Sequence, residues 1–333
     1  MNTLGYYFRF TNFGESHGPA MGGVVDGVPA GLPLDIEAVQ AMLNRRRPGS
    51  GAGNSTRRET DKIEILSGIF DGRTTGTPIA FTIANSDARS EDYDLMRDAI
   101  RPGHADATYM LKYGIRDHRG GGRASARTTA ATVAAGAMAM QFIATAGISV
   151  KAAVESIGGF SDEQEIEDAL AHARAEGDTL GGVVRCTIKG VPAGLGEPIF
   201  GKLQARLALA MMSLNAVKGF EYGEGFAAAG KKGSESLDHP VALDSALHTE
   251  QNHAGGLLGG ISTGEDITMR IAFKPIATMM RPIPTLRTDG TPCTLEPRGR
   301  HDVCAVRRAV PVVEALASLV MADALLAARL SRM

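Results

Sequence analysis

Hydrophobic and polar residues alternate in several short segments of the chain, and a period of two is that of a β-strand with one buried face. The clearest segment is 267–273, in which Ile, Met, Ile and Phe alternate with Thr, Arg and Ala. Shorter segments with the same character lie at 62–66, 78–83 and 183–188. We expect strands over these four segments.

Helix-forming residues and terminal signals predict helices over 35–47, 161–176 and 201–214. Ser161 suits the N-cap of the second helix because its hydroxyl can accept a bond from a free backbone N–H. A fourth helix is expected from Pro311 to near the C-terminus, since proline is tolerated in the first turn. Strands and helices mix throughout, so the fold class is α/β or α+β.

One short sequence occurs twice. Gly-Val-Pro-Ala-Gly-Leu stands at 27–32 and again at 190–195, each time between an apolar strand and a helix. This context indicates a duplicated unit, although two Pro-Gly turns can also arise independently. With duplication, we expect one catalytic domain over 1–333 whose related halves are roughly 1–150 and 151–333.

The longest uncharged stretch, 130–148, is long enough to span a bilayer. It is rich in Ala, Thr and Gly and contains Gln141, so we interpret it as a closely packed core helix and expect no membrane association. The N-terminus lacks the pattern of a signal peptide. The three cysteines are far apart and form no Cys-x-x-Cys pair, which favours a reducing cytoplasm.

Composition limits the partners of the chain. Hydrophobic residues are 44% and charged residues 22%, a globular balance, and the net charge is −2. Arginine nevertheless outnumbers lysine nearly three to one, and its planar fork suits planar anions. Aromatic residues are 5% with no Trp, so a nucleic-acid partner is not expected, and a phosphate- or nucleic-acid-binding module remains only an alternative.

Three glycine-rich loops interrupt the predicted elements. Segment 48–56 is flanked by five arginines and is a candidate lid over an anion, with a solvated surface loop as the alternative. Segment 101–127 is rich in arginine and enters the uncharged helix through three consecutive glycines, an arrangement that favours anion binding. Segment 252–264 contains paired glycines that permit close backbone approach to a ligand.

Other motifs are weaker. Segment 225–232 resembles a P-loop, but its last residue is Lys, where a Mg²⁺ site needs Ser or Thr. No Rossmann fingerprint follows a strand. His104 with Asp106, and His301 with Asp302, lack a third ligand at a suitable spacing, so no metal site is predicted.

Two histidines stand in contexts that suit proton transfer. His17 lies in the polar loop 14–18, and His104 lies in the arginine-rich loop. Both can exchange a proton near neutral pH. A structural role is the alternative for each.

Taken together, several segments in order resemble the chorismate synthase family. The segment Gly14-Glu15-Ser16-His17-Gly18, with residues 24–29 after it, resembles the first signature motif of that family. The second resembles 101–127, and the third resembles Arg300-His301-Asp302 followed by 309–315. The loop at 255–264 and Lys274-Pro275 also fit, so the resemblance covers nearly the whole chain.

This resemblance implies a reaction. 5-enolpyruvylshikimate 3-phosphate would lose phosphate and a ring proton in a 1,4-elimination that gives chorismate, the last step of the shikimate pathway. Reduced FMN would be required without net redox change, with NADPH as a candidate reductant of the flavin. The implied fold is a layered β-α-β sandwich with two pseudo-symmetric halves, and the implied assembly is a homotetramer.

The resemblance also implies roles for individual residues. His17 would assist the departing phosphate as an acid, His104 would hold or protonate the reduced flavin, and Asp302 would act with the flavin N5 in accepting the ring proton. The substrate anions would be clamped by Arg46, Arg101, Arg127 and Arg300, of which Arg46 also matches an NADP-associated arginine. The flavin contacts would come from Arg123, Ala124, Ser125, Asn215, Ala216, Gly259, Lys274, Pro275, Ile276, Ala277, Thr278 and Arg300.

The chain departs from the family pattern at several positions. Ala124 replaces a usual Ser, Thr128 a common Glu, and Ile276-Ala277-Thr278 the usual Thr-Ser-Ser, while Ala52 replaces a second loop arginine. Fewer hydroxyls are therefore available to FMN, and the nicotinamide site loses a cation. An FMN-dependent oxidoreductase is the alternative enzyme.

Overall fold

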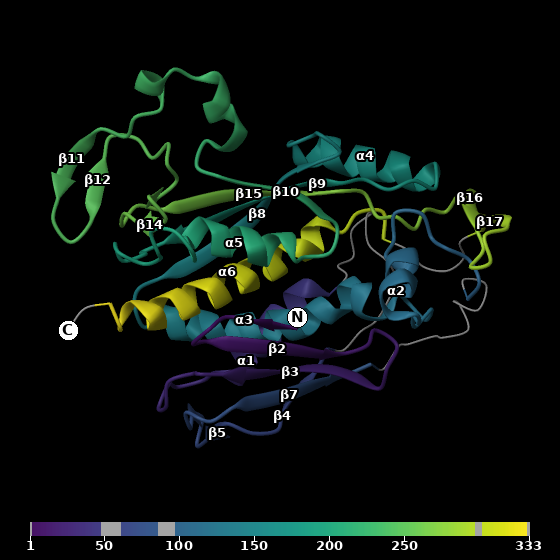
Figure 1. Ribbon diagram of the computed structural model, residues 1–333, viewed down its shortest axis with the longest axis horizontal. Helices are drawn as coiled ribbons and strands as arrows, with labels where there is room; N and C mark the ends of the chain where they lie inside the picture. The colour runs from purple at the N-terminus through teal and green to yellow at the C-terminus, as the bar shows by residue number, and fades with distance from the viewer. Residues whose placement is uncertain (1, 48–60, 86–96, 297–301, 332–333) are drawn as a thin grey trace.

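The computed structural model of the protein describes residues 2–47, 61–85, 97–296 and 302–331. Two antiparallel sheets enclose a layer of helices (Figure 1). The first sheet has the order β1 (Thr3–Leu4), β2 (Arg9–Gly14), β3 (Ala20–Asp26), β7 (Ile79–Ala84) and β4 (Ile63–Ile65). The second has the order β10 (Val217–Tyr222), β15 (Ile267–Phe273), β9 (Gly182–Lys189) and β8 (Ser149–Ile157).

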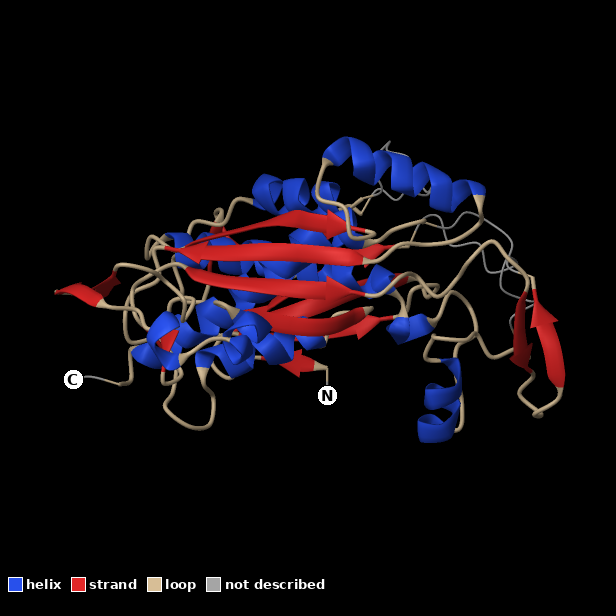
Figure 2. Ribbon diagram, turned by 90° about the horizontal axis from the view of Figure 1, so that it is seen from above, coloured by secondary structure: helices blue, strands red, loops and turns tan. Residues whose placement is uncertain are grey.

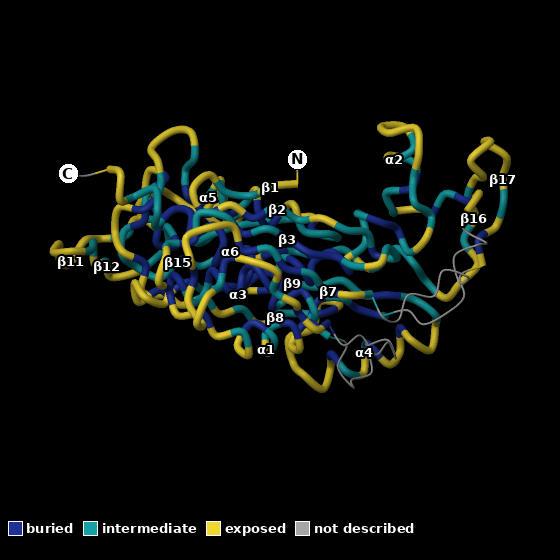
Figure 3. The backbone as a smooth tube through the Cα atoms, turned by 90° about the horizontal axis from the view of Figure 1, so that it is seen from below, coloured by how far each residue is buried: buried dark blue, intermediate teal, exposed yellow. Residues whose placement is uncertain are grey.

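The helical layer lies between the sheets and forms the core of the molecule (Figures 1 and 3). It contains α1 (Ile36–Arg46), α3 (Thr129–Ala144), α5 (Leu203–Met212) and α6 (Val306–Ala328). Two further helices, α2 (Asp106–Tyr113) and α4 (Glu163–Ala175), lie outside this layer (Figures 1 and 2). Short hairpins complete the described fold: β5 (Ile69–Phe70) with β6 (Arg73–Thr74), β11 (Pro240–Leu243) with β12 (Leu247–Thr249), β13 (Leu257–Leu258) with β14 (Ile261–Ser262), and β16 (Ile283–Leu286) with β17 (Pro292–Leu295).

Helices α3 and α6 pack against each other at the centre. A Cβ placed on Gly136 of α3 would lie only 2.3 Å from the Cβ of Ala315 in α6, so glycine is what permits this close approach. The uncharged stretch is therefore a buried core helix, as predicted. Helix α6 is also long and apolar enough to cross a membrane by composition, but 83% of its apolar window is buried inside the fold.

Most predicted elements are confirmed, and two boundaries are wrong. The N-cap of α4 is Asp162, not Ser161, and its carboxylate accepts bonds from the backbone N–H groups of Gln164 and Glu165 at 2.9 and 3.1 Å. Helix α6 begins at Val306, so Pro311 lies inside it and not in its first turn. Burial of almost every residue around Pro311 outweighs the one backbone bond that proline removes.

The six-residue repeat forms the same turn twice. In the first copy, the hydroxyl of Thr74 donates to the Pro29 carbonyl at 2.6 Å and accepts from the Leu32 N–H at 3.0 Å. In the second, the hydroxyl of Ser262 donates to the Pro192 carbonyl at 2.6 Å and accepts from the Leu195 N–H at 2.9 Å. The shared hydrogen bonds favour duplication over two unrelated turns.

The topology repeats as well. Strands β2-β3-β7-β4 lie in the same order and sense as β8-β9-β15-β10. Helix α1 follows β3 as α5 follows β9, and α3 follows β7 as α6 follows β15. The predicted fold class, a layered sandwich with two related halves, is confirmed, and the second set of elements begins at Ser149.

Candidate active site

A pocket of about 410 Å³ lies where several elements end. The C-terminal ends of α1, α5 and β15 meet the N-terminal ends of α3 and α6 there. It is lined by Arg46, Arg101, Gly103, His104, Ala105, Gly120, Ala124, Ser125, Ala126, Thr129, Leu214, Asn215, Ala216, Phe273, Lys274, Pro275, Ile276, Ala277, Thr278, Asp302, Ala305, Arg308, Ala309 and Val312. Most of the residues singled out in the sequence therefore lie around one cavity.

Some of the predicted site residues lie elsewhere. In the described part of the chain, His17, Arg123, Arg127 and Gly259 do not line this pocket. Arg300, with His301 and the candidate lid at 48–56 that contains Ala52, lies outside the described residues.

Positive charge predominates among the side chains that line the pocket. The N-terminal ends of α3 and α6 both reach it, and the positive end of a helix dipole attracts negative charge. Arg46, Arg101, Lys274 and Arg308 line it, whereas Asp302 is the one acidic side chain among the lining residues that the structure describes.

His104 lies in a buried cluster of charges. The carboxylate of Asp106, which is 4% exposed, lies 3.2 Å from the Nδ1 of His104. It also accepts bonds from Arg101, at 3.0 Å from the backbone N–H, 2.8 Å from Nε and 2.7 Å from Nη2. The Nη1 of Arg116 lies 3.1 Å from the same carboxylate. Burial alone would raise the pKa of Asp106, but the bonds from Arg101 and His104 outweigh it and hold that pKa far below its usual range.

The three consecutive glycines bring the two predicted catalytic histidines together. A Cβ on Gly120 would lie 2.0 Å from the Cε1 of His17, and one on Gly121 would lie 2.7 Å from the Cε1 of His104. Both glycines have a positive φ, +60° and +88°, a conformation that favours glycine. Because Gly120 lines the pocket, His17 lies directly behind its wall.

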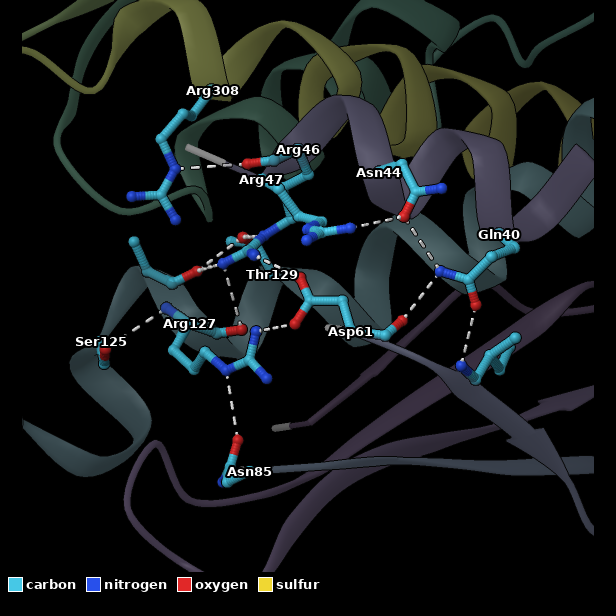
Figure 4. A network of polar contacts seen from close by, with 12 residues as sticks. Gln40, Asn44, Arg46, Arg47, Asp61, Asn85, Ser125, Arg127, Thr129 and Arg308 are labelled. Atoms are coloured by element: carbon cyan, nitrogen blue, oxygen red, sulfur yellow. Dashed lines mark hydrogen bonds and ion pairs between the residues drawn. The ribbon is translucent and has the colours of Figure 1, made fainter. Parts of the chain in front are cut away.

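Asp302 is held at the start of α6. The Nη1 of Arg308 lies 2.5 Å from its Oδ2, and the Nε of Arg308 also donates to the Arg46 carbonyl at 3.3 Å (Figure 4). The arginine thus joins the candidate proton acceptor to the end of α1. The sequence did not single out Arg308, although it stands six residues after Asp302.

Beneath the pocket, Asp61 joins two of the predicted substrate arginines (Figure 4). Its carboxylate, which is fully buried, pairs with the Nη1 of Arg46 at 3.1 Å and with the Nη1 of Arg127. Arg46 also donates to the hydroxyl of Thr129 at 2.9 Å and to the carbonyl of Ala126 at 3.1 Å. The Arg46 side chain is only 2% exposed, so its position is set by the N-terminus of α3.

Arg127 continues this network toward His17. Its Nε donates to the Oδ1 of Asn85 at 3.2 Å. The amide of Asn85 donates in turn to the carbonyls of Glu15 and Gly18, at 3.0 and 2.8 Å. Arg127 therefore supports the loop that carries His17, a connection that no sequence motif indicated.

Hydrogen bonds also join three of the segments predicted to contact the flavin. The amide of Asn215 donates to the Ala124 carbonyl at 2.7 Å, and the Lys274 N–H donates to the Ala216 carbonyl at 2.9 Å. The ammonium of Lys274 donates to the Gly103 carbonyl at 2.6 Å. One wall of the pocket is thus a continuous, bonded surface.

Two predicted flavin contacts, Arg123 and Gly259, lie away from the pocket. The guanidinium of Arg123 donates to the Asn12 side chain at 2.7 Å and to the Gly14 carbonyl at 2.9 Å, and so ties the loop to β2. Gly259 lies in the β13–β14 hairpin, and the neighbouring Gly260 carbonyl accepts from Leu203 at the start of α5. The pocket lies at the other end of that helix, about 15 Å away at 1.5 Å per residue.

Comparison with known proteins identifies the family. The chorismate synthase family profile matches residues 8–326. The chorismate synthase of Bacteroides thetaiotaomicron is 47% identical over 97% of this chain and 97% of its own length. That of Syntrophus aciditrophicus is 51% identical over 98% of this chain and 97% of its own. A crystal structure of chorismate synthase superposes with a TM-score of 0.77 at 32% identity, covering 97% of this chain and 93% of that one. The chain belongs to the chorismate synthase family.

Proposed function

We propose that the pocket at the ends of α3 and α6 is the active site in which this lyase converts 5-enolpyruvylshikimate 3-phosphate to chorismate with the help of reduced FMN. The C–O bond to phosphate breaks, a ring C–H bond breaks, and a new C=C bond forms, so atoms and charge balance without net oxidation. The observation that carries the proposal is the pocket itself: it joins two helix N-termini and four cations with His104 and Asp302. Three of these cations are paired with Asp61, Asp106 and Asp302, so Lys274 and the two helix N-termini supply the charge that remains for the phosphate and carboxylates of the substrate.

The residues present fit a flavin. A volume of about 410 Å³ lies in the usual range for ligand sites. The wall made of 124–125, 215–216 and 274–278 offers backbone groups, an amide and the Lys274 ammonium, which suit a phosphate and an anionic ring. At Ala124 and Ile276-Ala277 the chain departs from the family in its side chains only, so backbone groups there would still be available to a flavin, apart from the Ala124 and Ile276 carbonyls, which accept from Asn215 and Thr179 at 2.7 and 2.8 Å. Reduced FMN supplies electron density to the elimination when it is bound.

The protein groups divide the work of proton transfer. His104 would hold the reduced flavin or give it a proton, and Asp302 would help to accept the ring proton. His17, which contacts Gly120, donates a proton to a phosphate oxygen as the C–O bond breaks. Arg101 and Arg46 neutralise substrate anions, and Arg127 acts from behind through Asn85 and the His17 loop. Arg300 remains a proposed flavin contact on the resemblance alone, whereas Arg123 and Gly259, which the resemblance also implies, lie away from this pocket.

We further propose one catalytic domain over residues 1–333, a homotetramer and a cytoplasmic location. Large exposed apolar side chains, such as Tyr6 at 77%, Leu209 at 63% and Phe200 at 91%, support association with other copies. NADPH is proposed only as a reductant that keeps FMN reduced, since no dinucleotide fingerprint accompanies Arg46 in the sequence.

An anaerobic assay with chemically reduced FMN tests the proposed function. We expect phosphate and chorismate in equal amounts with no net consumption of reduced flavin. His17→Ala should lower kcat by about 10² to 10⁴, the usual range for a general acid. Phosphate release with oxidised flavin alone would overturn the proposal, and net oxidation of the substrate would make the protein an oxidoreductase. Turnover of the His17 variant at the wild-type rate would remove His17 from the mechanism.

A further inference from the structure

The carboxylate of Asp106 contacts both a proposed catalytic histidine and a proposed substrate arginine. It is 4% exposed and lies at the first residue of α2. Its Oδ1 lies 3.2 Å from His104 Nδ1 and 2.7 Å from Arg101 Nη2, and its Oδ2 accepts from the backbone N–H and the Nε of Arg101. Four N–H groups thus bond its two oxygens, and the Nη1 of Arg116 lies 3.1 Å from Oδ1 as an ion pair.

A carboxylate in this setting accepts and does not donate. The bond to His104 therefore requires a proton on Nδ1, and the other ring nitrogen, Nε2, is left for proton exchange. The edge of the ring that carries Cε1 and Nε2 lies against Gly121, because a Cβ there would be 2.7 and 2.9 Å from these atoms. The ring is thus fixed from one side by Asp106 and from the other by the glycine backbone.

We propose that Asp106 is a positioning residue that holds His104 with its proton on Nδ1 and holds Arg101 at the rim of the same pocket. This inference rests on the proposed role of His104 in the elimination. It makes the short segment from Arg101 to Asp106 one rigid unit, in which a single buried carboxylate sets both the tautomer of the histidine and the direction of the guanidinium.

Asp106→Asn tests the effect on the tautomer of His104. In the variant an NH₂ group replaces one of the two carboxylate oxygens, and it would then face N–H donors in place of an acceptor. At the Oδ2 position it would oppose the Arg101 backbone N–H and Nε, neither of which can become an acceptor. At the Oδ1 position it would also oppose the Nη2 of Arg101, but His104 can respond there by moving its proton to Nε2 and accepting at Nδ1. We therefore expect the variant to hold His104 in the opposite tautomer.

The chain offers a matched control in the same loop. Asp117 binds Arg119 with the same pattern, at 3.0 Å from its backbone N–H, 2.9 Å from Nε and 2.9 Å from Nη2. The Arg119 side chain is 45% exposed and that of Asp117 is 22% exposed. Neither lines the described pocket. Asp117→Asn thus removes an equivalent aspartate–arginine pair without touching His104.

Nitrogen-15 NMR of histidine-labelled protein, with His104→Gln to assign the signal, reads the tautomer without substrate or flavin. We expect Nδ1–H in the wild type and in Asp117→Asn, and Nε2–H in Asp106→Asn. In the full assay, kcat should fall about 10²-fold or more in Asp106→Asn and less than about twofold in Asp117→Asn.

An unchanged His104 tautomer in a folded Asp106→Asn protein overturns the proposal, whatever the rate. A rate equal to that of Asp117→Asn overturns it as well. If the Asn variant does not fold, Asp106→Glu gives the second measurement, because it keeps the charge but displaces the carboxylate by one methylene. Recovery of the Nδ1–H tautomer then supports the proposal, and Nε2–H overturns it. Failure of wild-type protein to release phosphate would instead count against the proposed function, since the NMR result does not depend on turnover.

Discussion

Burial acts differently on the two carboxyl groups that flank the proposed catalytic histidines. Asp106 remains ionised because arginine and histidine N–H groups outweigh its burial. At Glu15, next to Ser16 and His17, burial is the dominant effect and raises the pKa, although Arg123 opposes it. A raised pKa means that the folded protein binds the proton more tightly than the unfolded chain does, so ionised Glu15 destabilises the fold.

Glu15→Gln should therefore increase the free energy of unfolding at pH 7. The gain should shrink as the pH falls and vanish below about pH 4, the usual pKa of an unfolded glutamate, because the carboxyl is then protonated in both states. Urea denaturation at several pH values measures it, with exposed Glu64→Gln as the control. A gain that persists at low pH would show that the cause is not ionisation.

At the scale of elements, the glycines at 120–122, which precede α3, allow the backbone of that segment to lie close to the His17 ring. Gly120→Ala should displace the His17 ring, since the new Cβ would lie 2.0 Å from its Cε1. Gly147→Ala is the matched control: its φ is +78°, close to the +60° of Gly120, but a Cβ there meets nothing within 4 Å. Both variants should lose about 1 kcal/mol of stability from the left-handed backbone, while only Gly120→Ala should lower kcat, by about tenfold or more.

Equal rates for these two alanine variants would contradict a role for Gly120 in placing His17. Thermal denaturation of both proteins shows whether a lower rate in Gly120→Ala comes from the displaced His17 ring or from a general loss of folding. The expected result is a loss of Tm in both variants, larger in Gly120→Ala because its Cβ must displace the His17 ring, with a large difference in rate.

Elements could be predicted from sequence where their signal is local. The alternation at 267–273 fixed strand β15, since side-chain direction in a strand follows position alone. The start of α6 could not be predicted, because it depends on packing against α3, and the local signal of Pro311 pointed to the wrong turn. Likewise, the histidines and arginines of the site stand in recognisable motifs, whereas Asp61 and Asn85 do not. Their contacts with Arg127 join positions far apart in the chain.

At the scale of the whole molecule, the pocket lies where the two related halves meet. The ends of α1 and α5 are equivalent in the repeat, as are the starts of α3 and α6, and all four line the cavity. Duplication thus supplies two helix N-termini for anions, and the halves then differ in chemistry. The first half brings His17 and His104, and the second brings Lys274 and Asp302.

The same duplication predicts matching stability effects in the two halves. Thr74 and Ser262 are 3% and 4% exposed, and each hydroxyl makes two bonds that close its turn. Thr74→Ala and Ser262→Ala should each cost about 1 to 3 kcal/mol, because a buried N–H and a partly buried carbonyl lose their partner. Thr74→Ser should cost clearly less, since serine makes the same bonds at 262.

Urea denaturation of the single variants and of the double alanine variant measures these costs. We expect additivity within about 0.5 kcal/mol, since the turns share no partner. A large cost in one half and none in the other would show that the two turns, although alike in geometry, do not carry equal weight in holding the sandwich together.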